Sequence, residues 1–231
     1  GTGMALGMSR IPDMARAAKA ERRKVLTKTV PQGFRYAIML VLPVLGAVIV
    51  AGAPLIYKIF PNSLSADGVE TLRVFVALLV PWTVAALLVN FLLPPMFALG
   101  RGRLLNLLAL PLVILHVAVT AIASELWGVN ATVAAFTVAP AVFAVILLVA
   151  GAGSDWPQVA RQLARDTTRW VVFASLSFGI TGGLALALLG SGWAPALLAG
   201  LLGAIGYAVA LLTLAREQID VLLGAVRSGS A

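Results

Sequence analysis

Long apolar runs, separated by short polar segments, dominate this chain. A helix that crosses the hydrocarbon core of a bilayer needs about 20 largely apolar residues, because the core is roughly 30 Å thick and each residue rises about 1.5 Å. Six runs reach that length without an acidic or basic residue, and they are 36–57, 74–99, 104–124, 129–150, 170–189 and 194–214. The pattern predicts an all-α, polytopic transmembrane helix bundle with about six spanning helices.

The apolar positions within these runs are continuous, whereas the strands of a membrane barrel alternate between apolar and polar positions. Helices also satisfy their backbone groups internally, as the membrane interior requires. Composition agrees, since 61% of the residues are hydrophobic and 11% are charged, against roughly 45–50% and 25% in soluble chains. The bilayer is therefore the predicted surrounding of most of this chain.

The basic residues are distributed unevenly between alternate loops. One alternate set of loops holds fifteen of the seventeen Lys and Arg residues, and the other set holds only Lys58 and Arg73. Because Lys and Arg accumulate on the cytoplasmic side, we predict that both chain ends are cytoplasmic and that 61–71, 125–128 and 190–192 lie outside the cytoplasmic membrane. The net charge of +8 therefore reports topology, and we predict no nucleic-acid partner.

The polar segments also divide the chain into parts. These are 1–33, the end of a preceding span and a basic cytoplasmic linker; 34–150, a four-helix transmembrane part; 151–169, a cytoplasmic amphipathic loop; 170–215, a terminal transmembrane hairpin; and 216–231, a cytoplasmic tail. Residues 1–8 are typical of the last turns of an earlier span, so we expect a preceding part of the protein. For 13–30 and 151–169, a helix on the anionic lipid surface and a plain charged segment both stay open.

Several residue types indicate how the spans pack. Small residues recur at four-residue intervals in the last two runs, at Ser175, Gly179 and Gly183 and at Ala196, Gly200, Ala204 and Ala208. Such stripes let helix backbones approach in lipid, so we predict that these two runs pack as a tight hairpin. Trp127, Trp170 and Trp193 lie at run ends, which predicts interfacial anchors.

Prolines are frequent inside the runs, at positions 43, 54, 81, 94, 95, 111 and 140. Each interior proline removes a backbone hydrogen bond, so we predict kinked helices. Breaks of this kind are used by transporters, although static membrane bundles tolerate them too.

Catalytic signatures are missing from the sequence. There is no cysteine, His116 is the single histidine, and the nine acidic residues lie in loops or at the ends of segments. No phosphate-binding glycine loop follows a strand, and no carboxylate pair is available for acid and base roles within the membrane. We predict that the chain is not an enzyme and has no metal site and no cofactor.

Polar residues inside the runs are the candidates for a substrate path. His116, Thr120 and Ser124 form a stripe at four-residue spacing, and Trp82 and Asn90 lie in the second run. Polar groups at membrane depth mark substrate paths, but they also form structural hydrogen bonds between helices. Both interpretations stay open.

Three segments resemble those of a known family. They are Ser9-Arg10-Ile11-Pro12-Asp13-Met14-Ala15-Arg16 ahead of a run with Leu42-Pro43, Phe97-Ala98-Leu99-Gly100-Arg101-Gly102-Arg103, and Trp127-Gly128-Val129-Asn130-Ala131-Thr132-Val133-Ala134-Ala135. They resemble the second half of polysaccharide and lipid-linked oligosaccharide flippases, in the superfamily that includes lipid II flippases and multidrug extrusion proteins.

This resemblance implies two pseudo-symmetric halves around a central cavity, with this chain supplying most of the second half and with the N-terminal half missing. The implied substrate is an undecaprenyl-linked sugar, which moves to the outer leaflet by alternating access. Arg10, Arg101 and Arg103 near the cytoplasmic mouth are candidates for the pyrophosphate, because guanidinium groups bind phosphate oxygens in pairs. The preference of basic residues for the cytoplasmic side explains the positions of these three arginines equally well.

Two other functions compete with a flippase. A cation-coupled multidrug antiporter of the same superfamily ordinarily needs a carboxylate buried in the membrane, and the runs of this chain contain none. A membrane anchor or assembly subunit of a cell-envelope complex, which transports nothing, is the third interpretation.

Overall fold

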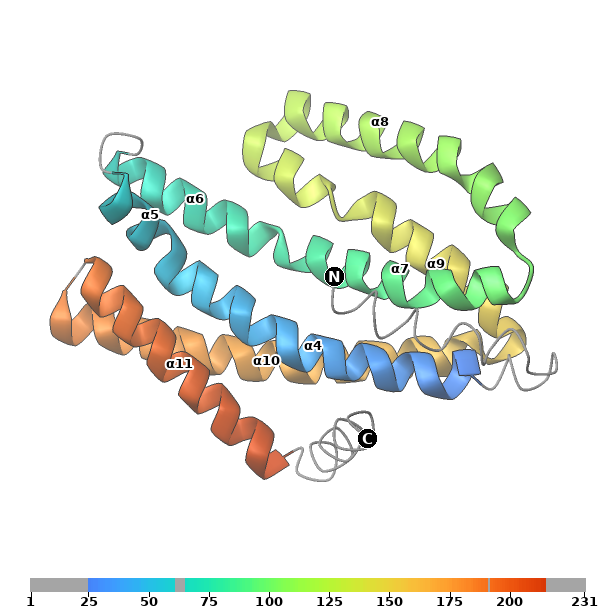
Figure 1. Cartoon of the computed structure of the whole chain (residues 1–231). Helices are drawn as coiled ribbons and strands as arrows, with labels where there is room; N and C mark the ends of the chain where they lie inside the picture. Colours follow the sequence, from blue (N-terminus) through green and yellow to red (C-terminus); the bar gives the residue numbers. More distant parts are fainter. Residues whose placement is uncertain (1–24, 61–64, 191, 215–231) are drawn as a thin grey trace. The chain divides into compact units, whose positions relative to one another are not determined.

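The computed structural model describes residues 25–60, 65–190 and 192–214, and all of the regular elements within these ranges are helices. In chain order they are η1 (Val25–Thr29), α4 (Val30–Ala47), η2 (Val48–Gly52), α5 (Ala53–Ile59), α6 (Ala66–Leu78), α7 (Val80–Ala98), α8 (Gly102–Ala135), α9 (Val138–Ala152), η3 (Gly153–Asp155), α10 (Trp156–Leu189) and α11 (Trp193–Leu214) (Figure 1). The elements η1 and η2 are short π-helices, and η3 is a short 3-10 helix. The all-α prediction is confirmed. The predicted preceding span, most of the basic linker and the tail lie outside the described residues.

Five helical stretches in the described part are long and apolar enough to cross a membrane, which makes the chain a multi-pass membrane protein. They are Leu26–Ile59, Asp67–Ala98, Gly102–Ala135, Val138–Leu189 and Trp193–Thr213. The predicted number was about six. The fourth stretch has 52 residues and includes the predicted run 170–189 and most of the predicted run 129–150, because η3 and α10 continue the helical path directly from α9.

Prolines interrupt some helices and not others. New helices begin just before Pro54 and Pro81, and α9 begins two residues before Pro140. Pro43, Pro94, Pro95 and Pro111 lie within continuous helices. Proline lacks an amide proton and its ring clashes with the carbonyl four residues back, so the preceding turn must change wherever the neighbouring packing does not compensate.

Three predicted loops contain more helix than expected. The predicted outer loop 125–128 reduces to one kink inside α8 at Gly128, whose φ of 77° and ψ of −166° favour glycine. The predicted outer loop 61–71 is wrong over its last residues, because α6 begins at Ala66. The predicted cytoplasmic segment 151–169 is helical from Trp156, as the helix alternative for this segment predicted, and it continues into the next span as α10. The amphipathic pattern there is strong enough to extend the helix.

The chain divides into two compact units, and each is described by itself. Unit 1 consists of the described residues up to Ile38 and Val74–Thr168; unit 2 consists of the described residues in Met39–Arg73 and from Arg169 onward.

In unit 1, helices α7, α8 and α9 lie side by side (Figure 1). Their contacts bury Leu92, Met96 and Leu147 completely. Phe34 of α4 packs edge-to-face on Phe91 of α7, with ring centroids 6.3 Å apart. Large side chains therefore fill the interior of this unit.

In unit 2, α11 packs against η2 and α5. The Phe178 ring of α10 fits between Gly46 and Gly203, where an added Cβ would lie 2.3 Å and 2.4 Å from that ring. Trp170 of α10 packs edge-to-face on Tyr207 of α11, with ring centroids 6.2 Å apart. These aromatic contacts join the last two spans.

The hairpin prediction was therefore right about the partners and wrong about three of the contact residues. Gly179 and Gly183 face open space, and Gly200 of α11 faces Ala51 of η2. Trp170 is also not an interfacial anchor, because it is 2% exposed, whereas Trp127 is 70% exposed. Small residues permit close approach, but the large side chain that occupies the space decides where it happens.

Candidate functional site

Threonine hydroxyls inside the spans mostly bond to their own helix. Each donates to the carbonyl oxygen four residues earlier, at 2.7–3.1 Å, and this holds for Thr83, Thr120, Thr132, Thr181 and Thr213. The burial of a hydroxyl with such a hydrogen bond costs little free energy at membrane depth. The structural interpretation of Thr120 therefore gains support.

Thr137 is different. Its hydroxyl oxygen is buried and has no hydrogen-bond partner among the described residues. It lies at the N-terminus of α9, after the turn at Phe136 that separates α8 from α9. A buried hydroxyl without a partner carries an energetic cost of about 1–3 kcal/mol, so an unpaired group of this kind points to a site that another molecule or a water completes.

The interruption before α9 follows from Pro140. Proline cannot donate to the Phe136 carbonyl, and instead the Phe136 and Thr137 amides donate to carbonyls three residues back, at 3.3 Å and 3.1 Å. The interrupted helix is visible in yellow in Figure 1. Because irregular backbone at membrane depth must lie in protein or line a water-filled path, this turn is a natural place for a polar site.

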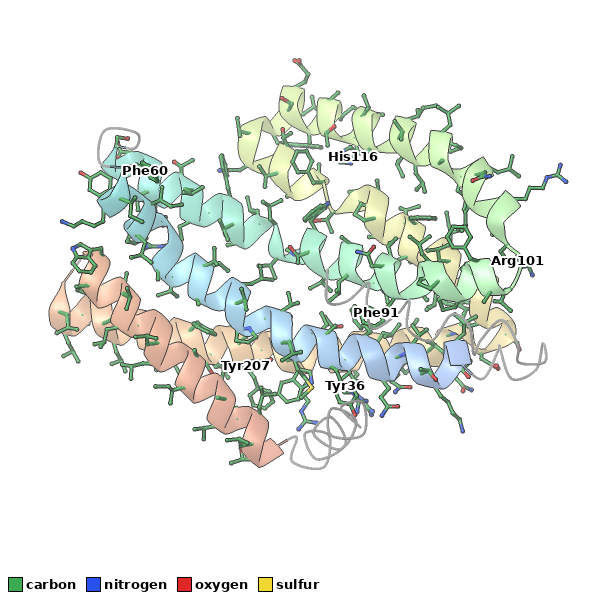
Figure 2. All side chains as sticks on the ribbon, in the orientation of Figure 1. Tyr36, Phe60, Phe91, Arg101, His116 and Tyr207 are labelled. Carbon is green, nitrogen blue, oxygen red and sulfur yellow. The ribbon has the colours of Figure 1, made fainter. Side chains whose placement is uncertain are left out.

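His116 reaches the same turn from the neighbouring part of α8. Its ring stacks on Phe136 with centroids 5.5 Å apart and an interplanar angle of 34°, and Figure 2 shows it on the α8 ribbon beside α9. His116 is half-buried and lies near the middle of the 102–127 part of α8. His116, Phe136 and Thr137 form what we call the mid-membrane site.

The other predicted residues of unit 1 are spread over its helices. Asn90 is half-buried on α7, which packs against α9, and Trp82 is 40% exposed near the start of α7. Ser124 is exposed on α8. No described hydrogen bond or ring contact joins Trp82 or Asn90 to His116, so they stay predictions.

Arg101 and Arg103 are exposed at the turn between α7 and α8, where Figure 2 labels Arg101. A helix rises about 1.5 Å per residue, so His116 lies roughly 20 Å from Arg101 along the axis of α8. One small polar head group cannot contact both at once. Arg10 lies outside the described residues.

Sequence reasoning missed one buried charged pair. The guanidinium of Arg35 donates from Nε and Nη2 to Asp166 Oδ2, at 2.8 Å and 2.5 Å. Their side chains are only 21% and 12% exposed. Asp166 lies between the exposed Arg165 and Arg169 of α10. It shares the buried face of the helix with Val159 and Leu163, and this spacing was the sequence signal that could have revealed a buried carboxylate.

The described residues contain no group of three or more His, Cys, Asp or Glu side chains that is placed to hold a metal ion. No protein-family model matches the chain, and searches of curated proteins and of solved structures find no match either. The resemblance to oligosaccharide flippases therefore stays a prediction that depends on the sequence segments alone.

Proposed function

We propose that this chain is part of a transporter that moves a lipid-linked oligosaccharide or polysaccharide precursor across the cytoplasmic membrane. The observation that supports this most is the mid-membrane site, where an interrupted apolar helix meets His116 and the unpaired Thr137 hydroxyl. Discontinuous helices and a rare ionisable residue at membrane depth are typical of transport pathways.

The chemistry of this site suits a saccharide. Hydrogen-bonding groups such as imidazole and hydroxyl match sugar hydroxyls, which both donate and accept hydrogen bonds. A polyprenyl chain needs only the apolar surface that the surrounding helices supply. No covalent step, cofactor or metal enters this proposal, and alternation between two open faces would move the substrate.

A buried carboxylate of unit 1 supports a flippase over a cation-coupled antiporter. Asp166 is the buried acidic residue of the described part, and Arg35 neutralises it through two hydrogen bonds. A carboxylate that binds and releases a coupling cation must be free to exchange that cation, and a carboxylate held by an arginine is not. The pairing favours transport without a cation site in this part of the protein.

A transport assay tests the proposal directly. The full-length protein is placed in vesicles with a fluorescent lipid-linked oligosaccharide, and movement between leaflets is measured by the quenching of exposed label. His116→Ala and Thr137→Val are expected to slow movement at least tenfold, because each removes a hydrogen bond to the saccharide. The matched control is Thr132→Val, whose hydroxyl bonds to its own helix. No movement with the unaltered, folded protein would contradict the proposal.

The predicted topology can be mapped separately, because the chain has no native cysteine. The proposal has both ends on the cytoplasmic side. Single cysteines at Arg22 and Arg161 are expected to react from the cytoplasm, and one at Glu70 from the opposite side. Labelling of Arg22→Cys and Arg161→Cys from opposite sides would exclude this arrangement of spans.

A further inference from the structure

Unit 2 contains a half-open cavity of about 870 Å³. Its walls come from η2, α5, the first part of α6, α10, the following turn and the start of α11. Cavities of roughly 300–1,000 Å³ hold drug-sized molecules, so this one has the size of part of a lipid and not of a whole polyprenyl-linked saccharide.

One wall of the cavity is open because it has no side chains. Gly179 and Gly183 line the cavity from α10, and a Cβ added at either would meet nothing within 4 Å. Gly182 lines it too, with Val50 as its nearest neighbour at 3.8 Å. The three glycines lie on the helix at spacings of three and four residues, so together they form a smooth apolar channel along α10.

Charged groups occupy one edge of the cavity. Lys58, Glu70 and Arg73 line it, so two cations face one carboxylate and the edge has a net positive charge. Arg73 Nη1 donates to Glu70 Oε2 at 2.7 Å, while Arg73 Nε is buried and has no partner among the described residues. One guanidinium donor is therefore held in place by Glu70, and another is unused.

An aromatic ring completes this edge. Lys58 Nζ lies 5.8 Å from the ring centroid of Trp193, which also lines the cavity. The cation is held over the ring face, and tryptophan prefers the level of the lipid head groups. Lys58 and Arg73 are also the two basic residues of the loops predicted to lie outside, where no topological rule calls for positive charge.

We infer that this cavity binds one anionic phospholipid of the outer leaflet, with its phosphate at Lys58 and Arg73 and an acyl chain along the glycine face of α10. Guanidinium and ammonium groups bind phosphate oxygens through charge-assisted hydrogen bonds. The apolar walls accept a chain and exclude a hydrophilic anion. The site is separate from the mid-membrane site, so it stands whether or not the chain transports a saccharide.

Native mass spectrometry of the full-length protein, released from detergent with added lipid, tests this inference. Phosphatidylglycerol and phosphatidylcholine with identical chains are compared, and the anionic lipid is expected to bind about tenfold more tightly, because the choline group cancels the charge of the phosphate. The Lys58→Gln, Arg73→Gln double variant is expected to lose this preference. Equal binding of the two lipids by the unaltered protein would overturn the inference.

Three further variants separate the parts of the site. Arg161→Gln, Arg165→Gln removes the same charge from exposed positions elsewhere and is expected to leave the preference unchanged. Glu70→Gln is expected to raise affinity for the anionic lipid a few-fold, because it removes the competing carboxylate. Gly183→Leu fills the channel and is expected to abolish binding of both lipids. Unchanged binding by Gly183→Leu, or displacement of the lipid by millimolar inorganic phosphate, would overturn the placement of the chain.

Discussion

The two units of this protein treat polar groups in opposite ways. Unit 1 holds them inside an apolar bundle, where Arg35 pairs with Asp166 and where Thr137 lies at the interruption before α9. Unit 2 keeps its charged groups at the edge of a cavity, where Glu70 and Arg73 are 64% and 37% exposed. The two ion pairs therefore contribute differently to the free energy of unfolding, because only the Arg35–Asp166 pair is removed from solvent.

Glycines in these helices also have opposite effects on packing. Gly33 in unit 1 lets the Phe91 ring approach to 3.0 Å of its Cβ position, and Gly203 in unit 2 does the same for Phe178. Gly179 and Gly183 instead leave space that no side chain of the described part fills. A glycine in a membrane helix thus creates either a tight contact or a cavity, and the neighbouring helix decides between them.

The largest expected effect is on the buried pair of unit 1. Asp166→Leu leaves the Arg35 guanidinium without its partner, which is expected to cost about 3–5 kcal/mol in the free energy of unfolding, measured in mixed micelles. The double variant Arg35→Leu, Asp166→Leu is expected to recover most of this loss. In unit 2, Glu70→Gln breaks an exposed pair and is expected to cost at most about 1 kcal/mol. Equal losses from Asp166→Leu and Glu70→Gln would remove the contrast between the units.

Next comes the tight contact of unit 2. Gly203→Ala puts a methyl group against the Phe178 ring, so it is expected to cost about 1–3 kcal/mol through overpacking. Gly183→Ala faces open space on α10, and it is expected to be neutral or slightly stabilising because alanine is the better helix former. Thermal unfolding followed by tryptophan fluorescence compares the two. A larger loss from Gly183→Ala would show that the open wall has been misidentified.

A comparable effect is expected at the kink of α8. Gly128 has a positive φ with an extended ψ and no neighbour that an added Cβ would meet, so Gly128→Ala is expected to cost about 1–3 kcal/mol from backbone strain alone. Gly102→Ala at the start of the same helix has ordinary space around it, with Phe97 3.9 Å away, and serves as the control. Denaturant titration followed by circular dichroism measures both. The absence of any difference would contradict the kink at this position.

The smallest effect is expected at Thr120. Its hydroxyl donates to the His116 carbonyl of its own helix at 2.7 Å, so Thr120→Val is expected to change the free energy of unfolding by no more than about 0.5 kcal/mol. Transport activity is also expected to persist, in contrast to His116→Ala. A fall in transport as large as that of His116→Ala would restore Thr120 to the substrate path.

Most of the helical architecture was predictable from the sequence because it depends on local properties. The length and hydropathy of each run predict a spanning helix wherever they occur. Gly128 and Pro140 change backbone geometry within one turn, so the separation predicted near Gly128 takes the form of a kink inside α8 instead of a loop, and Pro140 explains the second interruption. His116 stood out as the single histidine of the sequence and lies inside a predicted run, and the structure places it beside that interruption.

Only the tertiary structure decided which residues meet. Arg35 and Asp166 are 131 positions apart, and nothing in either local pattern pairs them. The glycine stripe of α10 was expected at a helix contact and instead lines a cavity, because Phe178 already fills the space between Gly46 and Gly203. Helix formation in lipid is a property of one segment, whereas a buried ion pair or an unfilled space exists only between segments, and its energy depends on atoms that the chain brings together after each helix has formed.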